Sequence, residues 1–223
     1  MPGYYDEKLS ADRLRRCYDM APPRVVQYLK AEVEHVLGSI GSQSTVLELG
    51  CGYGRVLNRL AEKATHCLGI DTSRGSLSTA RELLEQQSNL QLAQMDAVDT
   101  ALATASFDVV VCIQNGISAF HVDQRALMQE AVRITRPGGV ALFSTYAERF
   151  WEHRLEWFEV QAKAGLLGEI DHDATGDGVI VCKDGFRATT VSPDQFRVLT
   201  SGLDAGVKLY EVDESSLFCE IRV

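Results

Sequence analysis

Short apolar runs alternate with amphipathic segments along the chain up to about residue 145. The apolar runs predict strands at 45–49, 66–70, 90–95, 107–113 and 140–143. Between them, apolar residues recur at helical spacing and predict helices at 24–37, 56–61, 73–87 and 124–136. The run 107–113 is almost continuously apolar, which is typical of a strand covered on both faces. Strands that alternate with helices in this way predict βαβ units and a parallel sheet.

The last third of the chain has a different pattern. A helix that contains both tryptophans is predicted at 148–162, and short β segments separated by turns follow it at 166–170, 179–183 and 186–191. A short helix after Ser192 and two closing strands complete the chain. The expected fold class is therefore α/β, a doubly wound, mostly parallel seven-stranded sheet flanked by helices. A small β-hairpin and helix cap is expected as an insertion after the fifth strand.

The charge is unevenly distributed. The 223 residues include 22 Lys and Arg against 31 Asp and Glu, a net charge of −9. Residues 168–223 hold 11 acidic and 5 basic residues, so −6 of the net charge lies there. An acidic surface disfavours a long polyanion and an anionic membrane as partners. A small anionic metabolite near Arg13 and Arg16 is still compatible with this charge.

The six cysteines form no Cys-x-x-Cys pair and show no Cys/His ligand spacing, and they predict reduced, mostly buried thiols. The N-terminus has no apolar stretch typical of a signal peptide, and no run of 18 uncharged apolar residues occurs. These features predict a cytoplasmic protein without a membrane partner. His153 and His172 have no matching ligands at metal spacing, so we expect no metal site.

The chemically informative segment is Val-Leu-Glu-Leu-Gly-Cys-Gly-Tyr-Gly-Arg, residues 46–55. A predicted strand enters a turn whose glycines allow close approach of a ligand to the backbone, and a helix begins directly afterwards. A dinucleotide-binding loop, Gly-x-Gly-x-x-Gly, requires its third glycine at position 55, where Arg55 stands. The spacing present is Glu-x-Gly-x-Gly-x-Gly, which starts at Glu48.

This spacing resembles motif I of the class I, Rossmann-like S-adenosylmethionine (SAM)-dependent methyltransferases of the small-molecule type. Four further segments resemble the later motifs of that family in the same order. They are Asp71 at the end of the second strand, 17 residues after Gly54, then 94–97, 107–120 and 133–144. The five segments together cover about residues 45–145.

The resemblance implies SAM as the cofactor, and it implies which residues contact it. Asp71 is expected to accept the ribose hydroxyls, Asp96 to bind the adenine amino group, and Gln114 to lie beside the methionyl group. The alternative roles are a helix N-cap for Asp71, a turn acid for Asp96, and for Glu48 a partner of nearby backbone donors. The full set of expected cofactor-binding residues is Glu48, Gly50, Cys51, Gly52, Asp71, Thr72, Asp96, Ala97 and Gln114.

The resemblance implies in-line displacement at the SAM methyl group, for which the protein mainly supplies alignment and exclusion of water. This class has no universal catalytic residue, and a general base is needed only when the acceptor must lose a proton. By their place after the fourth and fifth strands, His121 is a candidate base and Tyr146 a candidate acceptor contact. The alternatives are a surface histidine and a structural tyrosine.

We expect a single methyltransferase domain over residues 1–223. It divides into an N-terminal helical lid (1–40), the SAM-binding core (45–145), the cap insertion (146–191) and the closing strands (192–223). Tyr4, Tyr5, Arg13 and Arg16 are candidate lid residues, although the arginines could equally pair with Asp12 and Asp19. Trp151 and Trp157 are expected in the core, with an aromatic wall for an acceptor as the alternative.

The function that the resemblance implies is methyl transfer from SAM to a small-molecule acceptor, and the acidic charge disfavours a nucleic acid partner. The alternatives are a protein or RNA methyltransferase and a non-catalytic SAM-binding protein. An NAD-dependent oxidoreductase is disfavoured by Arg55. The sequence indicates neither the acceptor nor an oligomeric state.

Overall fold

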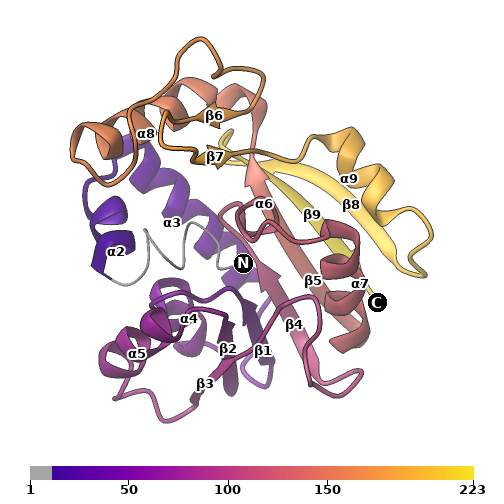
Figure 1. Ribbon diagram of the computed structural model, residues 1–223. Coiled ribbons are helices and arrows are strands. Elements are labelled where there is room, and N and C mark those ends of the chain that lie inside the picture. The colour runs from indigo at the N-terminus through magenta and orange to yellow at the C-terminus, as the bar shows by residue number, and fades with distance from the viewer. Residues whose placement is uncertain (1–11) are drawn as a thin grey trace.

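The computed structural model describes residues 12–223 and arranges them as a central sheet with helices on both faces (Figure 1). Within these residues seven strands form the sheet, in the order β3-β2-β1-β4-β5-β9-β8. Five neighbouring strands are parallel: β1 (Thr45–Leu49), β2 (His66–Asp71), β3 (Leu90–Gln94), β4 (Phe107–Cys112) and β5 (Thr135–Tyr146). Of the closing strands, β9 (Ser216–Arg222) pairs antiparallel with β5, and β8 (Gly206–Val212) pairs antiparallel with β9. The predicted doubly wound α/β fold is confirmed.

Burial on both faces explains the continuous apolar runs. The helices α3 (Pro23–Gly38), α4 (Arg55–Ala61) and α5 (Arg74–Leu83) cover one face, and α6 (Gly116–Ala119), α7 (Gln124–Ile134) and α9 (Pro193–Thr200) cover the other. Val46 and Leu47, neighbours in β1, belong to the cores on opposite faces and are both fully buried. Since side chains alternate along a strand, two covered faces require apolar residues at consecutive positions. None of the helices in residues 12–223 is long and apolar enough to cross a membrane.

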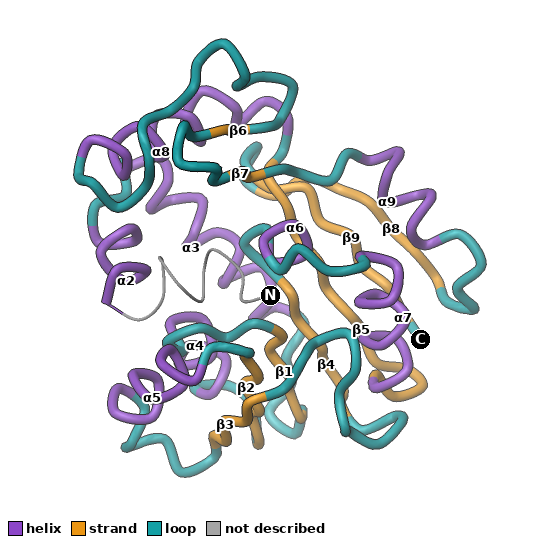
Figure 2. The backbone as a smooth tube through the Cα atoms, in the orientation of Figure 1, coloured by secondary structure: helices purple, strands orange, loops and turns teal. Residues whose placement is uncertain are grey.

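An insertion follows β5, as the sequence predicts. A 3-10 turn (Glu148–Phe150) leads into α8 (Trp151–Lys163), and the short strands β6 (Ile180–Val181) and β7 (Arg187–Ala188) pair antiparallel after it. Most of the segment between α8 and β7 is loop (Figure 2). We call residues 148–191 the cap. The cap has a small apolar core of its own, which includes Phe158, Leu166, Ile180 and Phe186.

Several predicted elements differ from the structure: the helix predicted at 73–87 ends at Leu83, and the strands predicted at 179–183 and 186–191 shorten to two residues each. The segment 166–170 forms no full strand, although Ile170 makes a single antiparallel bridge with Cys182. Leu166 and Leu167 are both buried in the cap core, whereas an extended strand would direct them to opposite sides. The fifth strand begins at Thr135 rather than at 140, and the preceding helix ends at Ile134. The Pro-Gly-Gly segment therefore lies inside β5, with the register shifted between Phe107 and Val109 of β4.

The helix α2 (Asp12–Asp19) is attached to the cap rather than to the sheet. Trp157 Nε1 donates a hydrogen bond to the Cys17 carbonyl at 2.9 Å. Arg13 Nη2 donates to the carbonyls of Gly165 and Leu166 at 3.0 and 3.1 Å. These contacts fix α2 to two segments of the cap, so the N-terminal helix and the insertion form one packed unit. The candidate lid residues Tyr4 and Tyr5 lie outside the described residues.

Candidate functional site

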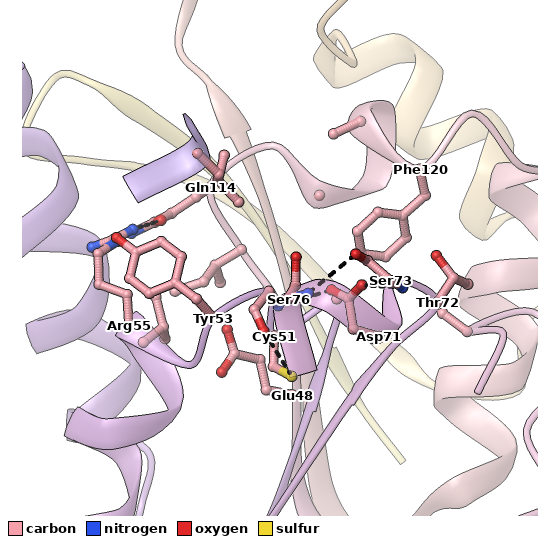
Figure 3. A pocket seen from close by; sticks show the side chains of 18 of the residues that line it. Glu48, Cys51, Tyr53, Arg55, Asp71, Thr72, Ser73, Ser76, Gln114 and Phe120 are labelled. Atoms are coloured by element: carbon pink, nitrogen blue, oxygen red, sulfur yellow. Dashed lines mark hydrogen bonds between the residues drawn. The ribbon is translucent and has the colours of Figure 1, made fainter. Parts of the chain in front are cut away.

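A cavity of about 540 Å³ opens at the carboxyl ends of the first four strands. This is the edge at which open α/β sheets bind their ligands. All nine residues expected to contact a cofactor line this cavity, and so does His121. Figure 3 shows labelled side chains at the ends of β1, β2 and β4 that converge on it, and Met95, Asp96 and Ala97 line it from the end of β3. The complete lining is Leu14, Tyr18, Glu48, Gly50, Cys51, Gly52, Tyr53, Arg55, Val56, Asp71, Thr72, Ser73, Ser76, Met95, Asp96, Ala97, Ile113, Gln114, Gly116, Ala119, Phe120, His121 and Val122.

The floor of the cavity is the glycine loop between β1 and α4. Gly50, Gly52 and Gly54 all have positive φ, at 72°, 55° and 85°, a conformation that residues with a Cβ rarely adopt. The amides of Gly50 and Cys51 both donate to the Ile70 carbonyl at the end of β2, at 2.8 and 2.9 Å. The loop is therefore fixed against β2, and its backbone faces the cavity without intervening side chains at the glycines.

Asp71 links the glycine loop to the end of β2. Its Oδ2 accepts the Gly52 amide at 2.8 Å, and its Oδ1 accepts the Ser73 amide, also at 2.8 Å. Ser73, not Asp71, is the N-cap of α5, because the Ser73 hydroxyl accepts the Ser76 amide. The alternative role of Asp71 as a helix cap is therefore wrong. A carboxylate oxygen has more than one lone pair, so each oxygen can accept a second hydrogen bond from a ligand.

The third strand end contributes a shallower part of the wall. Asp96 is exposed, and its Oδ1 accepts the Val98 amide at 3.1 Å, as a turn acid does. Ala97 is buried at 8% exposure and Thr72 is exposed. This part of the wall therefore offers the polar side chains of Asp96 and Thr72 beside the small apolar Ala97.

Glu48 is a buried carboxylate inside the cavity wall. It is 5% exposed, and its Oε2 has no hydrogen-bond partner among the described residues. Burial raises the pKa of Glu48 to about 8, and the charge of Asp71 acts in the same direction, whereas Arg55 opposes the shift. An unsatisfied buried oxygen of this kind has a large desolvation cost, and a ligand that donates a hydrogen bond to it recovers part of that cost.

The fourth strand ends in a constrained backbone. Gln114 and Asn115 have positive φ, at 57° and 65°. The Gln114 amide donates to Glu32 Oε2 and to Ser144 Oγ, each at 2.8 Å, and its side-chain carbonyl accepts from Arg55 Nη2. Glu32 is fully buried, and burial raises its pKa to about 7. The position of Gln114 at the cavity thus depends on a carboxylate from α3.

The two candidate catalytic residues lie in different places. His121 is exposed at the rim of the cavity, with a φ of 54°. Tyr146 does not line the cavity. It is 9% exposed and packs against Tyr28 and Phe150, with the Arg154 guanidinium 4.8 Å from its ring centre. The neighbouring Trp157 is also in the core.

Several residues around the cavity were not expected from the sequence. Leu14 and Tyr18 come from α2, and Phe120 closes against the glycine loop. The sequence pattern marks Arg55 only as the residue that interrupts a dinucleotide-binding motif. The sequence does contain a signal for Glu32: this acidic residue falls on the apolar face of its helix, between Leu29 and Val36, which indicates a buried carboxyl group. Arg13 bonds to the cap, and Arg16 is exposed.

Metal-binding side chains do not gather in the described part of the chain. No group of three His, Cys, Asp or Glu residues within residues 12–223 has the geometry to hold a metal ion.

Comparison with known proteins gives consistent matches. Residues 46–139 match a family model described as a methyltransferase domain. The chain is 35% identical over 103 residues to a ubiquinone biosynthesis O-methyltransferase of Aeromonas salmonicida, covering 45% of this chain and 42% of that protein. It is 33% identical over 123 residues to a malonyl-[acyl-carrier protein] O-methyltransferase of Yersinia pestis, covering 54% and 44%. The chain thus spans about half the length of the curated relatives it matches.

The fold is shared with solved methyltransferase structures. The DhpI-SAM-HEP complex superposes with a TM-score of 0.65 at 21% identity, covering 99% of this chain and 94% of that chain. At this identity the superposition shows a common fold, and the similarity extends over the cap as well as the sheet.

Replacing Gly50 with alanine should destabilise the protein through a contact with Phe120. An ideal Cβ on Gly50 would lie 2.2 Å from Phe120 Cζ, whereas one on Gly138, with a φ of 81°, meets nothing within 4 Å. We expect Gly50→Ala and Gly138→Ala each to lose about 1–2 kcal/mol from the left-handed backbone. Gly50→Ala should lose about 1–3 kcal/mol more from overpacking.

Urea unfolding measures both losses, and the excess at Gly50 should shrink in a Phe120→Ala background. Equal losses for the two alanine variants would show that the contact with Phe120 does not constrain the loop.

Glu48 should make stability depend on pH. Its pKa is raised from 4.5 to about 8 in the folded protein, so between these values the folded chain retains a proton that the unfolded chain has lost. The free energy of unfolding should therefore fall as pH rises through this window. Glu48→Gln removes the ionisable group, so the variant should gain stability relative to the wild type between about pH 5 and about pH 8.

Urea unfolding at a series of pH values tests this, with the exposed Glu85→Gln as the matched control. A Glu48→Gln profile parallel to that of the wild type would contradict the assignment of the buried proton to Glu48.

Proposed function

Because the chain carries a class I SAM-dependent methyltransferase domain, we propose that it transfers the methyl group of SAM to a small-molecule acceptor in this cavity. The observation that carries the proposal is the convergence of all nine expected cofactor residues, from four separate strand ends, on a single cavity. Methyl transfer from a sulfonium needs alignment more than chemical activation, and a rigid wall built from strand ends supplies alignment.

The residues present fit this cofactor. The glycine loop offers bare backbone, and at Gly50 no side chain could be accommodated next to Phe120. Asp71 accepts one backbone amide on each carboxylate oxygen, and a carboxylate oxygen can accept more than one hydrogen bond, so this group suits the ribose hydroxyls. Glu48 Oε2, buried and without a partner among residues 12–223, would accept a hydrogen bond from the ammonium group of the methionyl part. Asp96 and Ala97 would bind the adenine at the rim.

SAM supplies an electrophilic methyl group when it is bound, and the chain's own residues orient the acceptor and exclude water. Leu14 and Tyr18 from α2, together with Phe120, cover part of the cavity with apolar surface. We assign an oxygen nucleophile to the acceptor, in line with the names of the curated relatives. His121, exposed at the rim, would receive the proton that a hydroxyl loses on methylation.

The charge distribution of the chain favours a small acceptor over a nucleic acid. Of the net charge of −9, −6 lies in residues 168–223, which form part of the cap and the strands β8 and β9. A polyanion would be repelled from this part of the molecule.

The cysteines support a cytoplasmic location for the protein. All six are unpaired and buried, as in proteins of a reducing compartment.

The proposal predicts that the protein binds S-adenosylhomocysteine, the demethylated product of SAM, and does not bind NAD. Isothermal titration calorimetry with both ligands tests binding. Turnover is tested by the release of S-adenosylhomocysteine from SAM over a panel of hydroxylated small molecules. Absence of S-adenosylhomocysteine binding at millimolar concentration would overturn the proposal, whereas binding without turnover on any acceptor would favour a non-catalytic SAM-binding protein.

Asp71→Asn should weaken S-adenosylhomocysteine binding by about 1.5–3 kcal/mol, because a hydrogen bond to a charged acceptor is replaced by a neutral one. Asp99→Asn, at an exposed position outside the cavity, is the matched control for the change in charge. The 2′-deoxy analogue of the ligand should lose affinity for the wild type and much less for Asp71→Asn. Equal losses for both proteins would show that Asp71 does not contact the ribose.

A further inference from the structure

Arg55 is held across the cavity by residues from two other segments. Its guanidinium carbon lies 4.1 Å from the centre of the Tyr18 ring in α2, and its Nη2 donates to Gln114 Oε1 after β4. Figure 3 shows the Arg55 and Gln114 side chains meeting at one side of the cavity. A stacked and hydrogen-bonded guanidinium has a fixed orientation, so its remaining donors point in defined directions.

One of those donors has no partner in the described part of the chain. Arg55 Nε is buried and makes no hydrogen bond to any residue of 12–223, and the guanidinium forms no ion pair with a carboxylate there. Arg59, one turn further along α4, is the opposite case, since it pairs with Glu34 and Glu62 at 3.1 Å each. A buried N–H without an acceptor is costly, and a guanidinium is most strongly stabilised by a bidentate carboxylate.

We propose that Arg55 binds the carboxylate group of a ligand in this cavity, with Tyr18 and Gln114 as the residues that position its guanidinium. The proposal deepens the proposed function and rests on it for the identity of the cofactor. The carboxylate has two possible sources, the amino acid end of the cofactor or an acidic acceptor. Glu48 lies on the same cavity and carries the opposite charge when ionised, so the pair is complementary to a zwitterionic amino acid group.

Two variants of Arg55 separate its charge from its planar set of donors. Arg55→Met removes the charge and all donors, and Arg55→Lys keeps the charge without the planar fork. Arg59→Met is the control, because it makes the same change in charge on the same helix at an exposed ion pair outside the cavity. The melting temperature of each variant reports whether it is folded.

Two ligand pairs distinguish the sources of the carboxylate. S-adenosylhomocysteine and 5′-methylthioadenosine share the nucleoside, but only the first has a carboxylate. Benzoate and benzamide share a flat ring, and only benzoate is an acid. Calorimetry measures the dissociation constants of S-adenosylhomocysteine and 5′-methylthioadenosine on the free protein. It measures those of benzoate and benzamide on the protein with and without saturating S-adenosylhomocysteine.

If the cofactor supplies the carboxylate, Arg55→Met should bind S-adenosylhomocysteine about 10- to 100-fold more weakly and bind 5′-methylthioadenosine as the wild type does. The affinity of Arg55→Lys for S-adenosylhomocysteine should lie between that of the wild type and that of Arg55→Met. If an acceptor supplies it, Arg55→Met should instead lose the preference of the cofactor-saturated wild type for benzoate over benzamide. Arg59→Met should match the wild type in every measurement.

Two ratios decide the outcome: the affinity for S-adenosylhomocysteine over that for 5′-methylthioadenosine, and the affinity for benzoate over that for benzamide. The inference is overturned if both ratios are the same in Arg55→Met and in the wild type. A wild type that binds neither nucleoside would overturn the proposed function instead. In that case the benzoate and benzamide pair, measured without S-adenosylhomocysteine, still tests Arg55 by itself.

Discussion

The attachment of the glycine loop to the end of β2 is the constraint on which the site depends. The Ile70 carbonyl accepts two amides of the loop, and the Asp71 carboxylate accepts a third, that of Gly52. These bonds hold the loop in left-handed conformations that would otherwise be unfavourable for most residues. Because β1 and β2 are adjacent and parallel, the loop and the carboxylate meet at the same edge of the sheet. The floor of the cavity is therefore a direct consequence of strand order.

This arrangement requires two carboxyl groups to be buried, which lowers the stability of the fold. Glu32 and Glu48 are both buried deeply enough that their pKa values rise to about 7 and about 8, and neither forms an ion pair in the described structure. Glu48 Oε2 has no hydrogen-bond partner among residues 12–223, so its burial costs stability, because a polar group is poorly solvated in a core. Such local conflicts with stability concentrate at functional sites, where a ligand completes the electrostatics.

The cap contributes to the cavity indirectly, through α2. Leu14 and Tyr18 line the cavity, but the helix that carries them is fastened by Trp157 and by the carbonyls of Gly165 and Leu166. Tyr18 also packs against Trp157, with ring centres 5.7 Å apart. Two segments distant in the sequence thus form one packed unit, of which α2 lines the cavity. Changes in the cap can alter the cavity without touching it.

The sequence by itself determined the order of the sheet strands and the helices between them, and it indicated that the residues expected to contact the cofactor lie at one edge of the sheet. Each of those residues lies near the end of a strand or shortly after it, and parallel strands bring their carboxyl ends to one edge. The strand pattern and the family resemblance were therefore sufficient to place Asp71, Asp96 and Gln114 at one cavity. Only the tertiary structure decided that Tyr18 and Arg55 meet in the cavity and that Tyr146 does not reach it. The physical reason is that side-chain contacts between distant segments depend on how whole elements pack, which no local periodicity encodes.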